Sequence, residues 1–190
     1  MEQPDQNQAV VSLLVDRSKA GDTSAFGALM TMHQGYAYSI AFRILRSEDQ
    51  AKDVVQEAFV RIWKHVARYH ETAKFTTWLY TIVVRLCYDR MKSEKRRWNL
   101  FAREERASQE HEPVSRSLES EVEGRDTVDR ILALAKELPP KQRLVFMLRD
   151  LQDWTIGEIS EMTRMSVGTV KANLCLARKA LREAYNELEG

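Results

Sequence analysis

The sequence predicts an all-α protein made of two small helical domains joined by a flexible linker, and three observations lead to this fold class. Apolar residues recur at steps of three and four through most of the chain, while the period-two alternation typical of strands is missing. The 190 residues are 44% hydrophobic, which is enough to build packed cores. Residues 99–125 interrupt the helical pattern, so we expect separate domains on either side of them.

This interruption is the predicted linker. It holds few large apolar residues, 7 acidic against 4 basic ones, and both Pro113 and Gly124. Such a segment buries too little surface to offset the entropy lost on ordering. Its acidity fits either simple solvation or the shielding of a basic surface when no DNA is bound. The expected domains are therefore residues 1–98 and 126–190.

The first domain begins with two expected helices. The first covers roughly residues 6–19 and ends at the break formed by Gly21 and Asp22. The second shows one apolar stripe, which predicts a core-facing side. Its members are Tyr36, Ala37, Ile40, Ala41, Ile44 and Leu45.

A third helix is expected over DVVQEAFVRIWKHV, residues 53–66. Ser47 followed by Gln50 predicts a capping box before it. Its polar face includes Asp53, Gln56 and Glu57. Its apolar stripe comprises Val54, Val55, Ala58, Phe59, Ile62, Trp63 and Val66.

A fourth helix, FTTWLYTIVVRLCYDRMKSEKRR, follows the polar loop RYHETAK. The expected inward residues are Trp78, Leu79, Ile82, Val83 and Leu86. Its second half is rich in lysine and arginine. A run of this kind is usually just solvated, although a phosphate backbone would also attract it.

The second domain repeats this logic on a smaller scale. Pro139 ends a helix striped by Ile131, Leu132, Ala135 and Leu138, and Pro140 can open the next helix at its first position. Thr155 with Glu158 predicts a capping box, and Ser166 predicts the N-cap of a long final helix. The inward stripe of that helix is Val167, Val170, Leu174, Ala177 and Leu181.

A short helix, a tight turn and a long helix are typical of helix-turn-helix DNA-binding proteins. With Val170 inward, a rotation of about 100° per residue turns Gly168, Ala172, Cys175 and Lys179 outermost. The bare glycine at the helix start would let DNA approach closely, and charged flanks would meet phosphate. A helical hairpin with an ordinary solvated face is the alternative. The candidate DNA contacts are Ser166, Gly168, Thr169, Lys171, Ala172, Cys175, Arg178 and Lys179.

Composition excludes several function classes. The chain has no apolar run of about 18 residues and no signal peptide, so we expect a cytoplasmic protein without stable membrane insertion. Cys87 and Cys175 stand far apart with no metal-ligand spacing, and the four histidines accompany no catalytic motif. We therefore expect no metal, no cofactor and no enzymatic activity.

Two long segments carry a resemblance to a known family. DVVQEAFVRIWKHV followed by FTTWLYTIVVRLCYDR resembles region two of the bacterial extracytoplasmic-function (ECF) sigma factors, and LPPKQRLVFMLRDLQDWTIGEISEMTRMSVGTVKANLCLARKAL resembles their region four. The resemblance covers nearly the whole chain apart from the linker. It implies a dissociable promoter-recognition subunit of RNA polymerase, in which region two contacts the minus-ten element and region four the minus-thirty-five element.

The resemblance also implies partners and residue roles. Asp53, Gln56 and Glu57 match the surface that docks on the clamp helices of the polymerase β′ subunit, with region four meeting the β flap. The polar loop matches the segment that captures a flipped minus-ten base, where aromatic and charged side chains suit stacking and backbone contact. An anti-sigma factor is an implied partner. The minus-ten candidates are Tyr69, His70, Lys74, Phe75, Arg85, Arg90, Lys92, Arg96 and Arg97.

Three departures from the family pattern matter. Arg85 replaces a frequent asparagine, and Arg164 replaces a frequent glycine in the helix-turn-helix. Ala172, Asn173 and Leu176 occupy positions that are often polar or arginine in the family. We therefore expect sparse direct readout by this helix, with specificity from thymine methyl contacts and DNA shape.

A different class of protein is the main alternative. A helix-turn-helix regulator that acts without polymerase would use the same C-terminal hairpin. It would also need a sensor pocket or a phosphoacceptor in the N-terminal half and would bind duplex DNA on its own. The sequence shows neither of the two N-terminal features.

Overall fold

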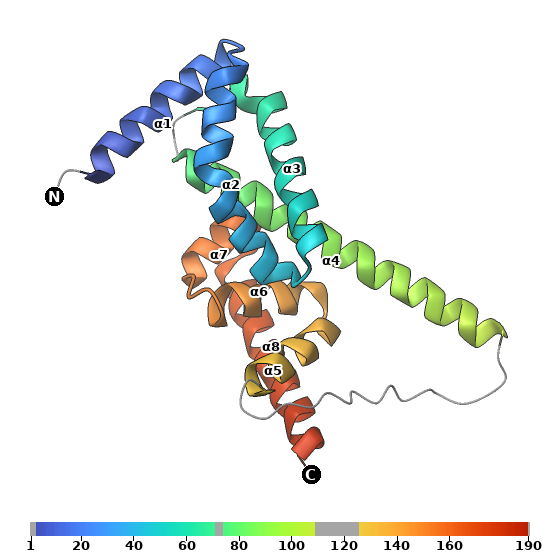
Figure 1. The fold of residues 1–190 in the computed structure, drawn as a ribbon. Coiled ribbons are helices and arrows are strands. Elements are labelled where there is room, and N and C mark those ends of the chain that lie inside the picture. Colours follow the sequence, from blue (N-terminus) through green and yellow to red (C-terminus); the bar gives the residue numbers. More distant parts are fainter. Residues whose placement is uncertain (1–2, 71–73, 109–125, 190) are drawn as a thin grey trace. The chain divides into compact units, whose positions relative to one another are not determined.

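The computed structural model describes residues 3–70, 74–108 and 126–189, and no strand occurs in these ranges. The predicted all-α fold class is confirmed. Figure 1 shows the helices in chain order. They are α1 (Gln3–Lys19), α2 (Thr23–Leu45), α3 (Glu48–His65), the short 3-10 turn η1 (Val66–Arg68), α4 (Phe75–Ser108), α5 (Asp126–Glu137), α6 (Pro140–Asp150), α7 (Ile156–Thr163) and α8 (Val167–Glu189).

The chain divides into two compact units, one formed by residues 1–87 with 160–164 and the other by residues 88–159 with 165–190. In the first unit, α1 and α3 both pack against α2. Leu29 and Ile44 of α2 and Val54 and Ile62 of α3 are fully buried there. The predicted stripes are therefore correct in outline. Tyr36 and Trp63 are exceptions, because both are exposed; Tyr36 packs its ring against Tyr80, and Trp63 packs its ring against Phe26.

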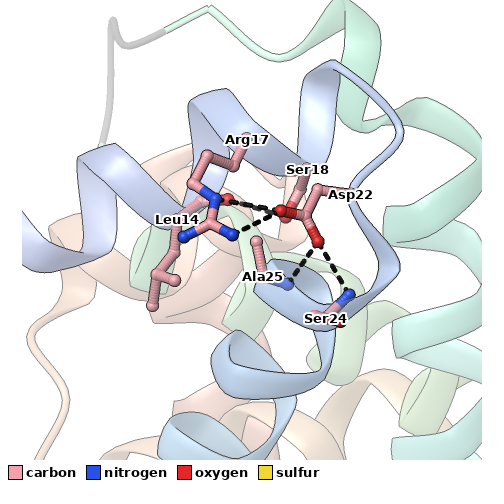
Figure 2. A network of polar contacts seen from close by, with 6 residues as sticks. All are labelled: Leu14, Arg17, Ser18, Asp22, Ser24 and Ala25. Carbon is pink, nitrogen blue, oxygen red and sulfur yellow. Dashed lines mark hydrogen bonds and ion pairs between the residues drawn. The ribbon is translucent and has the colours of Figure 1, made fainter.

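A charged network closes the turn between α1 and α2 (Figure 2). Gly21 adopts a positive φ of 89°, a conformation that glycine reaches without steric cost. The Asp22 carboxylate then accepts the backbone amides of Ser24 and Ala25 at 2.9 and 3.0 Å. Arg17 donates to the same carboxylate from Nε and Nη2, at 2.9 and 2.6 Å. These bonds hold the pKa of Asp22 below its ordinary value, the Ala25 amide having the largest effect and Arg17 the next.

Helix α4 is longer than the sequence analysis expected. It continues through Ser108, so residues 99–108 of the predicted linker are helical. The physical reason lies in the segment AREERA, whose alanine, arginine and glutamate are strong helix formers and outweigh the loss of an apolar stripe. The remainder of the predicted linker, 109–125, lies outside the described residues. The expected boundaries at 98 and 126 stay a prediction.

The C-terminal helices share a smaller core. Leu132, Ala135, Phe146, Met147 and Leu181 belong to one buried cluster, formed where α5 and α6 pack on α8. Pro140 begins α6, as predicted, and the structure places Pro139 at the N-cap. The stripe of α8 is buried except at its first residue, Val167, which is 46% exposed.

The capping predictions for this half are also confirmed. Thr155 and Glu158 form a reciprocal capping box, in which the Thr155 amide donates to Glu158 Oε2 at 2.7 Å and the Glu158 amide donates to Thr155 Oγ1 at 3.2 Å. Ser166 Oγ accepts the amide of Thr169 at 3.1 Å. Between these helices, Arg164 takes a left-handed φ of 59°. The turn therefore keeps a glycine-like backbone although the residue carries a side chain.

Candidate polymerase and DNA surfaces

The outer face of α3 is mainly polar but includes two exposed apolar residues, Val60 and Trp63. Asp53 and Gln56 are exposed, and Glu57 is half-buried and pairs with Arg61 at 2.6 Å. Val60 lies on the same side of the helix and is 51% exposed. The sequence analysis missed Val60, although its spacing from Asp53 and Glu57 marks it. A single exposed apolar side chain is common on protein surfaces, so Val60 alone does not mark a surface for a protein partner.

The predicted minus-ten loop is held by aromatic packing at its two described ends. Tyr69 stacks on Trp78 with ring centroids 4.8 Å apart and an interplanar angle of 19°, and Lys19 lies over the Tyr69 ring at 5.6 Å. His70 and Lys74 are exposed. Phe75 is only 2% exposed and contacts Tyr69 and Trp78 by its edge. The assignment of Phe75 as a DNA contact is therefore wrong, because its ring forms part of the core beneath the loop.

The basic residues of α4 fall into two groups. Arg85 and Arg90 are half-buried, whereas Lys92, Arg96 and Arg97 are exposed. Lys92 also lies over the Tyr88 ring at 5.6 Å, so its ammonium group is steered by an aromatic face. The exposed group is the part of the predicted minus-ten set that is most available to phosphate.

The N-terminal face of α8 is open. A Cβ placed on Gly168 would meet Ser166 Oγ at 3.9 Å, an ordinary contact, so the missing side chain leaves free space in front of the helix. Lys171, Ala172, Cys175 and Lys179 are exposed, as predicted. Thr169 is half-buried and its hydroxyl lies 2.8 Å from that of Ser166.

Two polar side chains of α8 are engaged with the protein itself. Asn173 donates to the backbone oxygen of Thr169 at 2.8 Å, which ties its amide to its own helix. Arg178 donates from Nε and Nη2 to Asp150 at 2.8 and 2.5 Å, and these hydrogen bonds raise its pKa. Leu176 is 52% exposed. The reading face of this helix is as apolar as the sequence indicated.

Other groups on the described parts of the chain contribute little chemistry. Cys87 is buried, and burial raises the pKa of its thiol, whereas Cys175 is exposed. Within residues 3–70, 74–108 and 126–189, no cluster of histidine, cysteine and acidic side chains is arranged to hold a metal ion. None of the described helices is long and apolar enough to cross a membrane.

A helical bundle together with a helix-turn-helix is typical of a DNA-directed transcription factor. The family model for sigma-70 region 2 matches residues 29–97, and the model for sigma-70 region 4 matches residues 129–181. The chain belongs to the ECF sigma factors. It is an alternative sigma factor that directs promoter-specific transcription.

Characterised relatives extend over the whole length of the chain. The ECF sigma factor SigW of Bacillus subtilis is 28% identical over 187 residues, covering 95% of this chain and 100% of that protein. The ECF sigma-E factor of Escherichia coli K12 is 28% identical over 184 residues, covering 92% and 93%.

Two solved structures share the fold. CnrH in complex with the cytosolic domain of CnrY has a TM-score of 0.59 at 19% identity, with 94% of this chain and 98% of that chain covered. The sigma factor RpoE of Bartonella quintana, in complex with the anti-sigma factor NepR, has a TM-score of 0.56 at 18% identity, covering 85% and 96%.

Proposed function

We propose that the two regions divide promoter recognition between them in the cytoplasm, without any bond chemistry of their own. The α3 face of Asp53, Gln56, Glu57 and Val60 docks on the β′ clamp helices of core polymerase. The loop before α4 and the exposed cations of α4 hold the minus-ten strand, and α8 enters the major groove at the minus-thirty-five element while its domain meets the β flap. The observation that carries this assignment is the match of sigma-70 region 2 to residues 29–97, within which these four residues share one side of α3.

The balance of charged residues supports the proposal that this protein needs core polymerase in order to bind promoter DNA tightly. Residues 126–190 carry 10 basic and 10 acidic side chains, so the C-terminal domain has no excess charge to drive independent DNA binding. Residues 1–98 carry 15 basic and 11 acidic side chains. A free chain of this kind binds duplex DNA weakly, whereas the holoenzyme combines both regions on one promoter.

An anti-sigma factor is part of the proposal. The solved structure of RpoE contains one, and CnrH was solved with a cytosolic partner domain. The α3 face offers a protein the same mixture of exposed apolar and acidic side chains that it offers polymerase. We therefore expect an inhibitor to compete with core polymerase for the chain.

Pull-down on core polymerase tests the docking face. Replacing Asp53, Gln56 and Glu57 together by alanine, or Val60 by lysine, should abolish retention of the chain while the melting temperature stays unchanged. Glu48→Ala is the matched control, because Glu48 is exposed on the same helix but on a different side. A collapsed melting temperature of the triple variant, or undiminished retention, would refute the assignment.

Gel-shift titration separates this function from the polymerase-independent regulator. The free chain should bind promoter duplex weakly at physiological salt, and the complex with core polymerase should bind it tightly. Tight, sequence-specific binding by the free chain would favour the regulator.

A further inference from the structure

The ion pair between Asp150 and Arg178 has a geometry that serves more than stability. Asp150 is the last residue of α6, and Arg178 lies on α8. Both carboxylate oxygens are used, since Nε donates to Oδ2 at 2.8 Å and Nη2 donates to Oδ1 at 2.5 Å. A two-point pair of this kind fixes the plane of the guanidinium as well as its position.

The surroundings of the pair argue against a purely stabilising role. The side chains of Arg178 and Asp150 are 53% and 20% exposed, so solvent screening reduces what this pair contributes to stability even with its two-point geometry. A carboxylate at the C-terminus of a helix is also disfavoured by the partial negative charge there. Asp150 therefore occupies a position that helix stability alone does not select.

The pair leaves part of the guanidinium available. Asp150 engages Nε and Nη2, so the Nη1 edge faces away from the carboxylate. Arg178 and Arg182 follow Lys171 by seven and eleven residues, which are close to whole numbers of helical turns. All three side chains therefore lie on the same side of α8. Lys171 and Arg182 are exposed. Lys171 and Arg178 are separated by about 10 Å along the axis, close to the width of a major groove of about 12 Å.

We propose that Asp150 is a positioning residue that holds Arg178 so that its free edge binds a backbone phosphate beside the minus-thirty-five element. The proposal rests on the assignment of α8 as the recognition helix. It makes Arg178 a phosphate contact, which sets the register of the helix in the groove and reads no base directly. Asp150 acts only through Arg178, since a carboxylate itself repels the phosphate backbone.

The direction in which activity changes when Asp150 is neutralised distinguishes this positioning role from simple charge repulsion. Removing any acid near DNA should strengthen binding, because one unit of repulsion is lost. If Asp150 positions Arg178, then Asp150→Asn should instead lower transcription from minus-thirty-five-dependent promoters by about tenfold. Glu183→Gln is the matched control, because Glu183 is an exposed acid of α8 that pairs with Lys179 at 3.7 Å. This variant should keep or slightly raise activity.

The experiment is run-off transcription by holoenzyme reconstituted with each variant, over a series of salt concentrations. Arg178→Ala should reduce activity as Asp150→Asn does, and the double variant should be no worse than Arg178→Ala alone. All three should show a salt dependence shallower by about one charge. The charge-reversed variant Asp150→Arg with Arg178→Asp should restore the pair and the melting temperature but not transcription.

The remaining outcomes overturn the proposal. Unchanged or higher activity of Asp150→Asn, or recovery of transcription in the charge-reversed variant, would show that the pair only joins α6 to α8. Lys171→Ala separates this failure from that of the proposed function. If Lys171→Ala lowers minus-thirty-five-dependent activity while Asp150→Asn does not, only the positioning role is wrong. If neither variant alters activity, α8 is not the recognition helix and both assignments are wrong.

Discussion

The N-termini of α2 and α8 meet the same physical requirement with different caps, one ionised and one neutral. Both leave backbone amides without helical partners. At α2, Asp22 accepts two of them and is itself bound by Arg17, so a carboxylate and a cation neutralise the site. At α8, the cap is the neutral Ser166, and the first turn, which lies wholly in the described part of the chain, contains no acid.

This difference concerns whether the N-terminus of each helix can bind an anion from outside the protein. The start of α2 is satisfied within the protein and has no need of an outside anion. The start of α8 keeps the positive end of its dipole, and Gly168 keeps the space in front of it clear. A phosphate or a base edge can approach α8 but gains nothing at α2.

The largest expected effect concerns this cleared space. Gly168→Leu should lower transcription from minus-thirty-five-dependent promoters more than about tenfold, because the new side chain occupies the place of DNA. Fold stability should rise slightly, since leucine is the better helix former. Run-off transcription and thermal melts measure both.

A matched glycine sharpens this test. Gly157 is the second residue of α7 as Gly168 is of α8, and a Cβ there would also meet only a capping hydroxyl, at 3.9 Å among the described atoms. Gly157→Leu should therefore keep activity. Full activity of Gly168→Leu would contradict the placement of α8 in the groove.

Giving α8 the acidic cap of α2 should have the next largest effect. Ser166→Asp retains a good N-cap, so the melting temperature should hold or rise. Activity should fall about fivefold, because the carboxylate neutralises the helix end and repels phosphate. Ser166→Asn keeps the cap without the charge and should remain close to wild type. Equal activities of the two variants would show that the charge of this cap is irrelevant.

A smaller effect on stability is expected from the backbone just before the caps Asp22 and Ser166. Gly21 and Arg164 both have positive φ, and only glycine adopts it freely. Arg164→Gly should stabilise the helix-turn-helix by about 1 kcal/mol. Glycine removes the backbone strain of the left-handed conformation in the folded state, and this gain exceeds the extra conformational entropy that glycine gives the unfolded chain. Hydrogen exchange in α7 and α8 should slow about fivefold. Arg164→Ala keeps Cβ and should bring no such gain, and equal slowing in both variants would contradict the role of φ.

The smallest effect is a pH dependence at Asp22. Its folded pKa lies below the ordinary value of 3.8, so its contribution to stability is present at neutral pH and is lost as pH falls below about 4. Asp22→Asn keeps a capping oxygen that does not ionise. The wild type should melt higher than this variant at pH 7, and the difference should shrink steadily as the pH falls below about 4. A difference that is constant with pH would exclude the carboxylate charge as the cause.

The sequence predicted most of the fold because its signals are local. Stripes, proline pairs and caps such as Thr155 with Glu158 act over one or two turns, where helix geometry fixes the outcome. The burial of Phe75 and the pairing of Asp150 with Arg178 depend on tertiary packing and carry no local signal. The sequence analysis missed the helical residues 99–108 for another reason: helix propensity alone sustains α4 where no apolar stripe continues.

The apolar outer face of α8 has a consequence for the promoters that this protein serves. Each good side-chain contact to a base edge is worth about 1–3 kcal/mol of discrimination, and selection preserves a promoter base only where such a difference exists. With α8 placed at the minus-thirty-five element as proposed, the bond of Asn173 to its own helix and the exposed Leu176 leave few positions of that element under this constraint. The upstream elements of its promoters should therefore drift in sequence, retaining thymines and a groove shape while most of the information lies downstream.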